Sequence, residues 1–372
     1  MRVKDLRPTG PAAAPALSVR ASSAAELLRL IGVLVDDTDE YDVGPERLAE
    51  LRGRLSEEVL SELRALDGGS RVSFQVLSLL GADLPDPAGV EEMVAALESD
   101  PGLGWRLLLA HHAHQTNHDQ RPDIELLEAV VVGRDGALTT LLDELEDATG
   151  LADEVRSLLS TDPEAHGQRL LAAVHAVQPL WDSVAQETMH AISRDVEHRQ
   201  SQVDAGSSVA EVVLAATNGY ELSDDPSIRR IVLLPSFWIR PWLVVGRRAD
   251  AEVLSTVVAE EFLILPPEAP SPALLKLFKA LGDESRLTLL RRLSSGPISL
   301  TEATAELDVA KATAHHHLSI LRQAGLVVIG GEGRGSRYAL RQDPPTVAAQ
   351  ALAAYLQPHR TSSLGHPETQ EG

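Results

Sequence analysis

The sequence predicts a mainly α protein of the α+β class, with a helical N-terminal region that carries a small β-meander and a smaller C-terminal domain. Three observations lead to this prediction. Apolar residues recur at helical spacing from Ser22 to about Gly219. Short β-prone runs follow between residues 228 and 258, and a proline-rich segment separates them from a second helical stretch. The chain has 372 residues, which is long enough for more than one domain.

The helices of the N-terminal region are predicted from apolar spacing and from proline positions. One apolar stripe consists of Leu51, Leu55, Val59, Leu63 and Leu66. Asp162 followed by Pro163 is typical of a helix start, because Asp caps the free N–H groups and Pro fits the first turn. By the same reasoning Pro179 is interpreted as the start of a further helix.

Three β-prone runs predict the meander near residues 228–258. They extend from Ile231 to Leu234, from Trp242 to Val245 and from Val253 to Val258. Residues 265–272 then contain four prolines, which fit neither a helix nor a central strand. We therefore expect a regulatory region at 17–264, a linker at 265–272 and a C-terminal domain at 273–357.

The charge of the chain is unevenly distributed. The formal net charge is −22, yet the segment from Pro270 to Arg360 holds 11 Lys and Arg against 7 Asp and Glu, a net of +4. The remainder holds 22 basic and 48 acidic side chains, a net of −26. Such asymmetry favours nucleic acid as a partner of the basic segment.

Composition also excludes several kinds of site. The chain has no cysteine, so disulfides, thiolate metal sites and cysteine nucleophiles are excluded. No apolar run approaches the roughly 18 residues of a membrane span, and the N-terminus has no signal-peptide pattern. We expect a cytoplasmic protein with no membrane association.

The C-terminal domain has a definite order of predicted elements. Helices are expected at 274–281, 284–293, 299–307 and 311–323, and short strands at 326–329 and 336–340. Asp283 is expected to cap the second helix, and Gly325 to end the fourth. The strands flank a glycine-rich hairpin at 330–335. This order of elements is that of the winged helix-turn-helix.

The fourth helix has the side chains of a DNA-reading helix. Its apolar positions are Ala314, Leu318 and Leu321, and the opposite face carries short or hydrogen-bonding side chains that fit a major groove. The hairpin adds groups that can reach phosphate or the minor groove. The expected DNA-binding residues are Lys311, Ala312, Thr313, His315 and His316 on the helix and Arg334, Ser336 and Arg337 on the hairpin.

Three segments of this domain resemble the ArsR/SmtB-type winged-helix regulators. They are Phe278 to Leu287, Thr313 to Leu326 and Gly333 to Tyr338, which look like the family's second helix, recognition helix and wing. The resemblance covers roughly a quarter of the chain. It implies a DNA-binding transcriptional regulator, often a repressor, that reads a roughly palindromic operator as a homodimer.

The resemblance also implies where the dimer forms. The family's dimer surface uses the first helix of the domain and a last helix, here expected at 346–356. The corresponding apolar residues are Leu274, Leu277, Leu281, Val347, Ala351 and Tyr355.

The sequence departs from the family pattern in two ways. Ala310 stands where the family usually has a Ser or Thr cap on the recognition helix, and a lost cap costs about 1 kcal/mol. Family metal sites use cysteines near the third helix or Asp and His on the last helix, and residues 299–309 and 346–356 contain neither set. The implied regulator is therefore metal-independent, and no cofactor is expected.

Histidines and acidic residues elsewhere have two interpretations. His315, His316 and His317 are consecutive, so their side chains point about 100° apart and do not chelate one ion. Three further histidines, at 111, 114 and 118, share a helix face, as a metal site would require or as a polar helix end would present. The acidic run at 36–42 lacks the glycine and the distal glutamate of a calcium loop and is interpreted as a solvated loop.

Phe237, Trp238 and Trp242 form the densest aromatic cluster in a chain with 3% aromatic residues. The cluster fits an effector pocket, ordinary core or a domain interface. The first option suits an N-terminal region that senses an unknown small-molecule or protein effector.

Two other functions remain open from the sequence. The winged helix is also compatible with protein binding, in which case an acidic or apolar surface should cover the fourth helix. The N-terminal region is also compatible with an enzyme that the winged helix regulates. Against an enzyme stands the lack of a phosphate-binding glycine loop, a G-x-S-x-G elbow and an HExxH motif.

Overall fold

The computed structural model forms two compact units, Met1–Ile264 and Leu265–Gly372. It describes residues 15–36, 41–69, 73–86, 88–114, 122–146, 153–217, 219–220, 222, 225, 227–248, 250–263, 270, 272–330, 337–341, 348–349, 352–353 and 355–356. The predicted class is confirmed, since helices dominate and the sheets are small. No helix in these ranges is long and apolar enough to cross a membrane.

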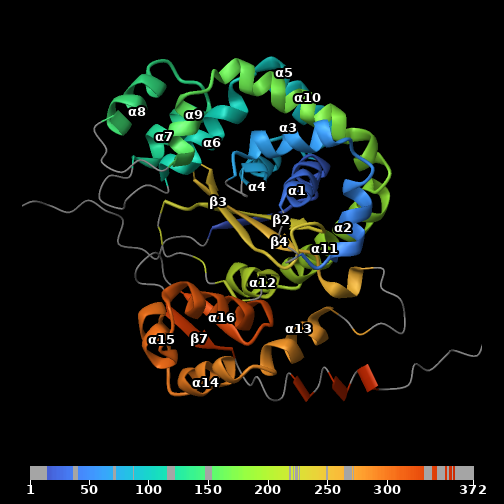
Figure 1. Ribbon diagram of the computed structural model, residues 1–372, viewed down its shortest axis with the longest axis vertical. Coiled ribbons are helices and arrows are strands. Elements are labelled where there is room, and N and C mark those ends of the chain that lie inside the picture. The colour runs from blue at the N-terminus through green and yellow to red at the C-terminus, as the bar shows by residue number, and fades with distance from the viewer. Residues whose placement is uncertain are drawn as a thin grey trace, which may run out of the picture. The chain divides into compact units, whose positions relative to one another are not determined.

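The first unit is a helical layer packed on a small sheet (Figure 1). Its helices are α1 Ser23–Val35, α2 Pro45–Arg52, α3 Glu57–Asp67, α4 Ser73–Leu77, η1 Ser78–Ala82, α5 Val90–Ser99, α6 Leu103–His114, α7 Ile124–Val131, α8 Ala137–Glu146, α9 Asp153–Leu159, α10 Pro163–Asp182, α11 Ala185–Asp204, α12 Val209–Ala216 and η3 Glu260–Phe262. Asp162 caps α10 as predicted, its carboxylate accepting from the N–H of Ala165 at 2.8 Å. The prediction for Pro179 is wrong, because this residue lies inside α10.

The sheet of this unit corrects the predicted meander. Its strands are β1 Ala16–Val19, β2 Arg230–Ser236, β3 Val244–Arg248 and β4 Ala251–Val257, in the order β1-β2-β4-β3. The three predicted runs are strands, but β4 lies between β2 and β3 and pairs with β2 in parallel. Only β3 and β4 form an antiparallel hairpin.

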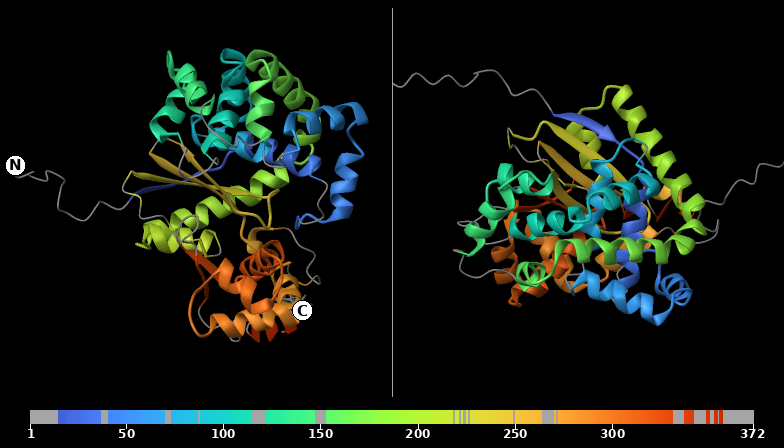
Figure 2. Two further views of the ribbon diagram at one scale, coloured as in Figure 1. Left: turned by 60° about the vertical axis from the view of Figure 1, so that its left-hand side comes forward. Right: turned by 90° about the horizontal axis from the view of Figure 1, so that it is seen from above.

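The physical reason for this order is that β2 is buried on both faces. Ile231 and Leu233 pack with Val212 and Val213 of α12, and Val232 packs on the opposite face near η1. An unbroken apolar run is typical of a central strand in a parallel arrangement, whereas a meander strand with one wet face alternates. Figure 2 shows the sheet between helices on its two sides.

α1 is the central helix of the helical layer. Every residue from Ala24 to Val35 is buried. The layer also buries an ion pair, in which Arg29 Nη1 lies 2.8 Å from Glu26 Oε1. Glu26 Oε2 accepts from the backbone N–H of Phe237, and Arg29 donates to the Ser255 hydroxyl. Buried charges of this kind are tolerated because each finds a partner, and this pair ties α1 to the sheet.

The second unit is the predicted winged helix. Its elements are α13 Pro272–Leu281, α14 Glu284–Leu293, β5 Ile298–Ser299, α15 Leu300–Leu307, α16 Lys311–Gln323, β6 Val327–Gly330 and β7 Arg337–Leu340. The strands form a sheet in the order β5-β7-β6, and β5 was not predicted. Asp283 caps α14 and Gly325 has a φ of 70°, which confirms both predicted helix ends. The linker 265–272 lies almost entirely outside the described residues.

Candidate nucleic-acid interface

α16 is held by one face and exposes the other. Ala314, Leu318 and Leu321 are each 0% exposed and pack in the core with Leu289 and Leu326. Since side chains three and four residues apart share a helix face, the remaining positions of the first two turns point outward. The exposed residues are Lys311, Ala312, Thr313, His315 and His316, the five expected on this helix.

The start of α16 has no side-chain cap. Ala310 has the extended backbone of a capping residue but no hydrogen-bonding group. Asp308, one possible substitute, instead ends α15 with a left-handed φ of 52°. The first N–H groups of α16 therefore receive no acceptor from the capping residue. N–H groups at a helix start are the groups that bind phosphate in many proteins.

The wing is anchored at its base by Arg337. This side chain is 54% exposed and its Nη2 donates to the carbonyl of Pro297 at 2.7 Å and to Glu302 Oε2 at 3.3 Å. Hydrogen bonds from Ser299 are the main cause that lowers the pKa of Glu302, and the charges of Arg337 and Arg292 add to it. Arg337 is thus oriented by the start of α15. Arg334 and Ser336 lie outside the described residues.

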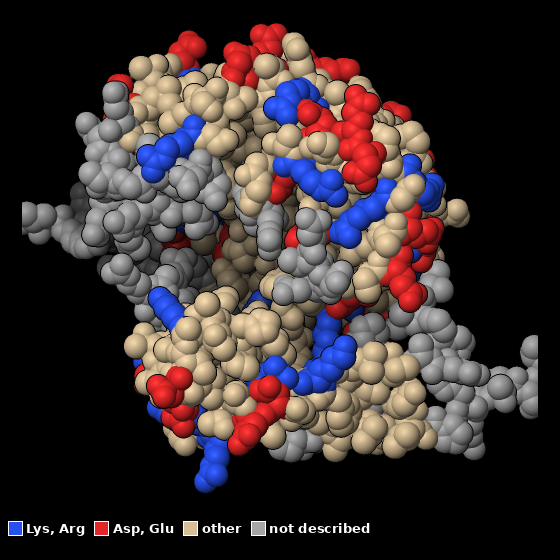
Figure 3. Space-filling model, in the orientation of Figure 1, with Lys and Arg blue, Asp and Glu red and all other residues tan. Residues whose placement is uncertain are grey.

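The charge of this unit is mixed over its surface. On the face drawn in Figure 3, basic and acidic side chains are interspersed on the second unit, while acidic side chains spread widely over the first. Lys311 is the only Lys or Arg among the five exposed positions of α16 named above. The helix therefore presents hydrogen-bonding and short side chains with one cation, and it does not present an acidic or broadly apolar surface.

The first helix of the unit presents different residues from those expected at a dimer surface. Leu274 and Leu277 are only 7% and 4% exposed, because they face the interior of the unit, and Leu281 is half-buried. The exposed apolar residues of α13 are Leu275 at 45% and Phe278 at 42%. In the segment 346–356 the described positions are helical, and Leu352, Tyr355 and Leu356 are exposed. Val347 and Ala351 lie outside the described residues.

The aromatic cluster of the first unit belongs to its core. Trp238 is 1% exposed within the main cluster of buried residues, and Phe237 and Trp242 pack against that cluster. The rings of Phe237 and Trp238 meet edge to face, 5.0 Å apart. This packing fits the core interpretation of the cluster and offers no support for the effector pocket expected there.

His111 and His114 lie on α6, and His118 lies outside the described residues. His112 beside them is buried, and its ring meets that of His111 edge to face. Within the described ranges, no group of three or more His, Asp or Glu side chains is placed to hold a metal ion.

Comparison with known proteins finds relatives of the second unit. A family model described as a helix-turn-helix domain matches residues 281–329. An uncharacterized HTH-type transcriptional regulator of Bacillus subtilis, YceK, is 39% identical over 70 residues, which are 18% of this chain and 70% of the relative. The Biofilm growth-associated repressor of Agrobacterium fabrum is 34% identical over 94 residues, 23% of this chain and 80% of the relative.

Two further matches also cover about a fifth of this chain. The arsenical resistance operon repressor of Escherichia coli is 32% identical over 79 residues, which are 21% of this chain and 68% of the relative. A crystal structure of an ArsR family transcriptional regulator matches with 30% identity, covering 22% of this chain and 90% of that one, with a TM-score of 0.21. Each of these similarities involves less than a quarter of the chain.

Proposed function

The chain belongs, through its C-terminal domain, to the ArsR-type helix-turn-helix transcriptional regulators, and we propose that it is a metal-independent repressor whose N-terminal unit senses an effector. α16 is its recognition helix. It reads base edges in the major groove of a roughly palindromic operator, and the wing contacts the neighbouring backbone.

One observation carries this proposal. Lys311, Thr313, His315 and His316 are all exposed on one helix whose other face is fully buried. The rigid core fixes the helix, so these side chains approach a groove together without reordering the domain. A surface for protein binding would instead be acidic or broadly apolar at this place, and the exposed positions are neither.

The proposal is tested by fluorescence anisotropy with DNA from immediately upstream of the protein's own coding region. The full chain is titrated at several salt concentrations, beside Thr313→Ala, Lys311→Ala and the control Arg291→Ala at an exposed position of α14. Thr313→Ala should cost about 1–3 kcal/mol on the operator and little on scrambled DNA, because a base contact specifies sequence. Lys311→Ala should weaken binding to both and lower the salt slope by about one, as for a lost phosphate contact.

Two results would contradict it. The first is equal binding to operator and scrambled DNA that does not change in either variant. If DNA fragments selected from the whole genome also showed no specific binding, the winged helix would be assigned to another partner. An equal loss in Arg291→Ala would mean that the variants only reduce net charge and that α16 has no special role in binding.

We further propose that the regulator acts as a homodimer through the outer face of α13. Leu275 and Phe278 are exposed apolar residues one turn apart on this helix, and Leu352 and Tyr355 add exposed apolar area from the last segment. Light scattering after gel filtration should find a dimer for the wild type and a monomer for Leu275→Ser with Phe278→Ser. Leu287→Ser on α14 is the control, because Leu287 is equally exposed at 49%. A dimer that persists in the double variant would place the interface elsewhere.

Regulation requires that an effector bind two states of the protein unequally. The N-terminal unit, with its own core and sheet, is the proposed place for that binding. Loss of operator affinity on adding an effector to the full chain is the expected result for a repressor.

A further inference from the structure

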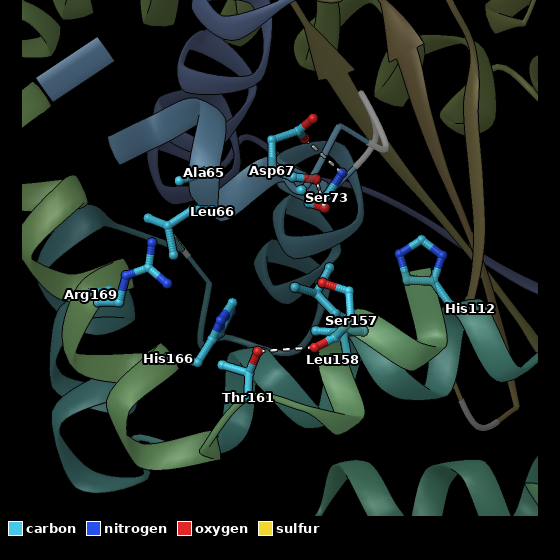
Figure 4. A pocket seen from close by; sticks show the side chains of 12 residues that line it. Ala65, Leu66, Asp67, Ser73, His112, Ser157, Leu158, Thr161, His166 and Arg169 are labelled. Carbon is cyan, nitrogen blue, oxygen red and sulfur yellow. Dashed lines mark hydrogen bonds between the residues drawn. The ribbon is translucent and has the colours of Figure 1, made fainter. Parts of the chain in front are cut away.

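The first unit contains a small polar pocket where α3, α4, α6, α9 and α10 meet. Figure 4 shows the side chains that line it. Its volume of about 60 Å³ holds roughly four to six water molecules. Its lining includes the apolar side chains of Leu66, Leu108 and Leu158 and, from α10, the side chains of His166 and Arg169. The pocket therefore suits a molecule that carries both a charged group and a short apolar part.

His166 is the unusual side chain in this pocket. It is 5% exposed, and its Nε2 atom is buried without a hydrogen-bond partner among the described residues. A buried polar atom without a partner is costly and requires an explanation. Because this one lies at a pocket, a bound molecule is one that the geometry allows. Burial, and next the positive charge of Arg169, lower the pKa of His166. A bound negative charge would therefore reduce the positive electrostatic potential at this imidazole.

Arg169 supplies that positive field. It projects from α10 one turn after His166, on the same side of the helix (Figure 4). Its Nε donates to Glu62 at 2.6 Å. That pair is partly exposed, at 42% and 43%, so it is weakened by solvent and can rearrange. The two terminal nitrogens, which have no partner among the described residues, remain to donate to a ligand.

The other charged groups around the pocket do not oppose an anion directly. Asp67 turns its carboxylate toward the start of α4, where Oδ1 accepts from the N–H of Ser73 at 3.2 Å (Figure 4). Glu62 is already paired with Arg169. His112 lines the pocket from α6 and is buried. The hydroxyl of Thr161 donates to the carbonyl of Ser157 and so is turned to its own loop.

We propose that this pocket binds a small organic carboxylate of roughly four to six non-hydrogen atoms, held by His166 Nε2 and the guanidinium of Arg169. A carboxylate accepts from both donors at once, and charge-assisted hydrogen bonds of this kind are the strong ones. The leucine side chains of the lining contact its carbon atoms. This inference rests on the proposed function in one respect only, since it names the ligand class for the N-terminal sensing unit.

The experiment is isothermal titration calorimetry of the full chain with pyruvate and acetate, and with acetamide as the neutral match of acetate. The carboxylates should bind and acetamide should not. His166→Leu and Arg169→Gln should each weaken pyruvate binding by about tenfold to a hundredfold, the usual range for a hydrogen bond to a charged group. Glu62→Gln should strengthen it severalfold, because it releases Arg169.

Two comparisons separate a binding role from a structural one. His166→Gln keeps an N–H donor in place of Nε2–H and should recover part of the affinity lost in His166→Leu. In the wild type, pyruvate binding should tighten as the pH falls, because the bound anion raises the pKa of His166. The accompanying proton uptake is measured by comparing binding enthalpies in two buffers of different ionisation enthalpy. In His166→Gln the pH dependence should be lost. Arg47→Gln is the matched control, since it removes a similarly exposed Arg–Glu pair from α2.

Several results would overturn the proposal. They are equal binding of acetamide and acetate, no heat at millimolar pyruvate with the wild type, or an equal loss in Arg47→Gln and Arg169→Gln while circular dichroism shows all variants folded. Operator binding is measured separately on the same samples. Carboxylate binding without any operator binding would contradict the proposed function but not the carboxylate site. Operator binding without any carboxylate binding would contradict the carboxylate site alone.

Discussion

The first turn of α10 depends on the missing side chain of Gly167. A Cβ at this position would lie 1.9 Å from the carbonyl oxygen of Pro101 and 2.6 Å from its carbonyl carbon. No rotamer relieves a contact with backbone, so α10 or the segment at Pro101 would have to move. Because His166 precedes this glycine, the close approach also fixes where the imidazole enters the pocket.

Gly167→Ala should therefore destabilise the first unit by about 1–3 kcal/mol, as overpacking a tight contact usually does. Urea unfolding monitored by tryptophan fluorescence measures the change. Gly53→Ala is the matched control, because Gly53 has an ordinary φ of −63° and its Cβ would come no closer than 3.3 Å to Ala49 O and 3.5 Å to Glu50 O. An equal effect of the two substitutions would show that the structure accommodates a Cβ next to Pro101 without added strain.

Asp225 gives the clearest pH dependence of a single residue. Hydrogen bonds from Ser227 and then Arg247 lower the pKa of Asp225 from 3.8 to about 2. A carboxyl whose pKa is depressed on folding stabilises the fold above its unfolded pKa, and this contribution is lost as the pH falls through the folded pKa. The window here runs from about pH 3.8 down to about pH 2.

Carboxyl chemical shifts followed by NMR should report a pKa of about 2 for Asp225. Ser227→Ala should move that pKa upward, because it removes the hydroxyl that contributes most. Asp250 is paired with Arg230 instead, so its pKa should stay in place in this variant. An unchanged pKa for Asp225 in Ser227→Ala would assign the depression to Arg247 and the backbone N–H of residue 227.

At the scale of elements, α16 begins without a side-chain cap. Ala310 has φ −62° and ψ 150°, the extended conformation that a capping Ser or Thr adopts, and its position is exposed. Ala310→Ser should therefore stabilise the C-terminal domain by about 0.5–2 kcal/mol, by accepting an N–H of the first turn. Thermal unfolding measures the gain. Ala312→Ser, two positions into the same helix, should give none, and equal shifts in the two variants would mean that no cap forms.

The helices of the C-terminal domain could be predicted because local signals mark their ends. Asp283 caps one helix, Ser299 caps the next with a capping box to Glu302, and Gly325 ends the last. Local signals are also why the face of α16 was predicted correctly, since the spacing of Ala314, Leu318 and Leu321 fixes it.

Strand order and the pocket could not be predicted in this way, because both depend on contacts between distant segments. β1 and β2 pair across more than two hundred residues, and nothing in residues 16–19 marks them as the neighbour of residues 230–233. The pocket is lined by residues of five helices, and the only trace in the sequence is the spacing of His166 and Arg169. The prediction that Pro179 starts a helix was wrong for a related reason. The sequence around a proline does not show whether the surrounding structure accommodates it within a helix, as α10 does here.

At the scale of the whole molecule, the charge imbalance has a consequence for DNA binding. The segment from Pro270 to Arg360 has a net charge of +4 and the rest of the chain −26. Non-specific DNA binding depends on charge, and at about 0.15 M salt charges are screened beyond about 8 Å. The acidic N-terminal unit should therefore oppose weak, sequence-independent binding mainly at low salt, and so favour the operator over the many competing sites.

A fragment of residues 270–372 should accordingly bind scrambled DNA more tightly than the full chain at low salt. The difference in affinity between the fragment and the full chain should decrease as the salt concentration rises. Screening weakens the long-range repulsion by the acidic unit before it weakens close contacts. Anisotropy of the two proteins over a salt series measures both trends, and a shared loss in Lys311→Ala would verify that the fragment uses the same helix. Equal affinity of fragment and full chain at low salt would mean that the acidic unit stays beyond electrostatic reach of bound DNA, and selectivity would then rest on the base contacts of α16 alone.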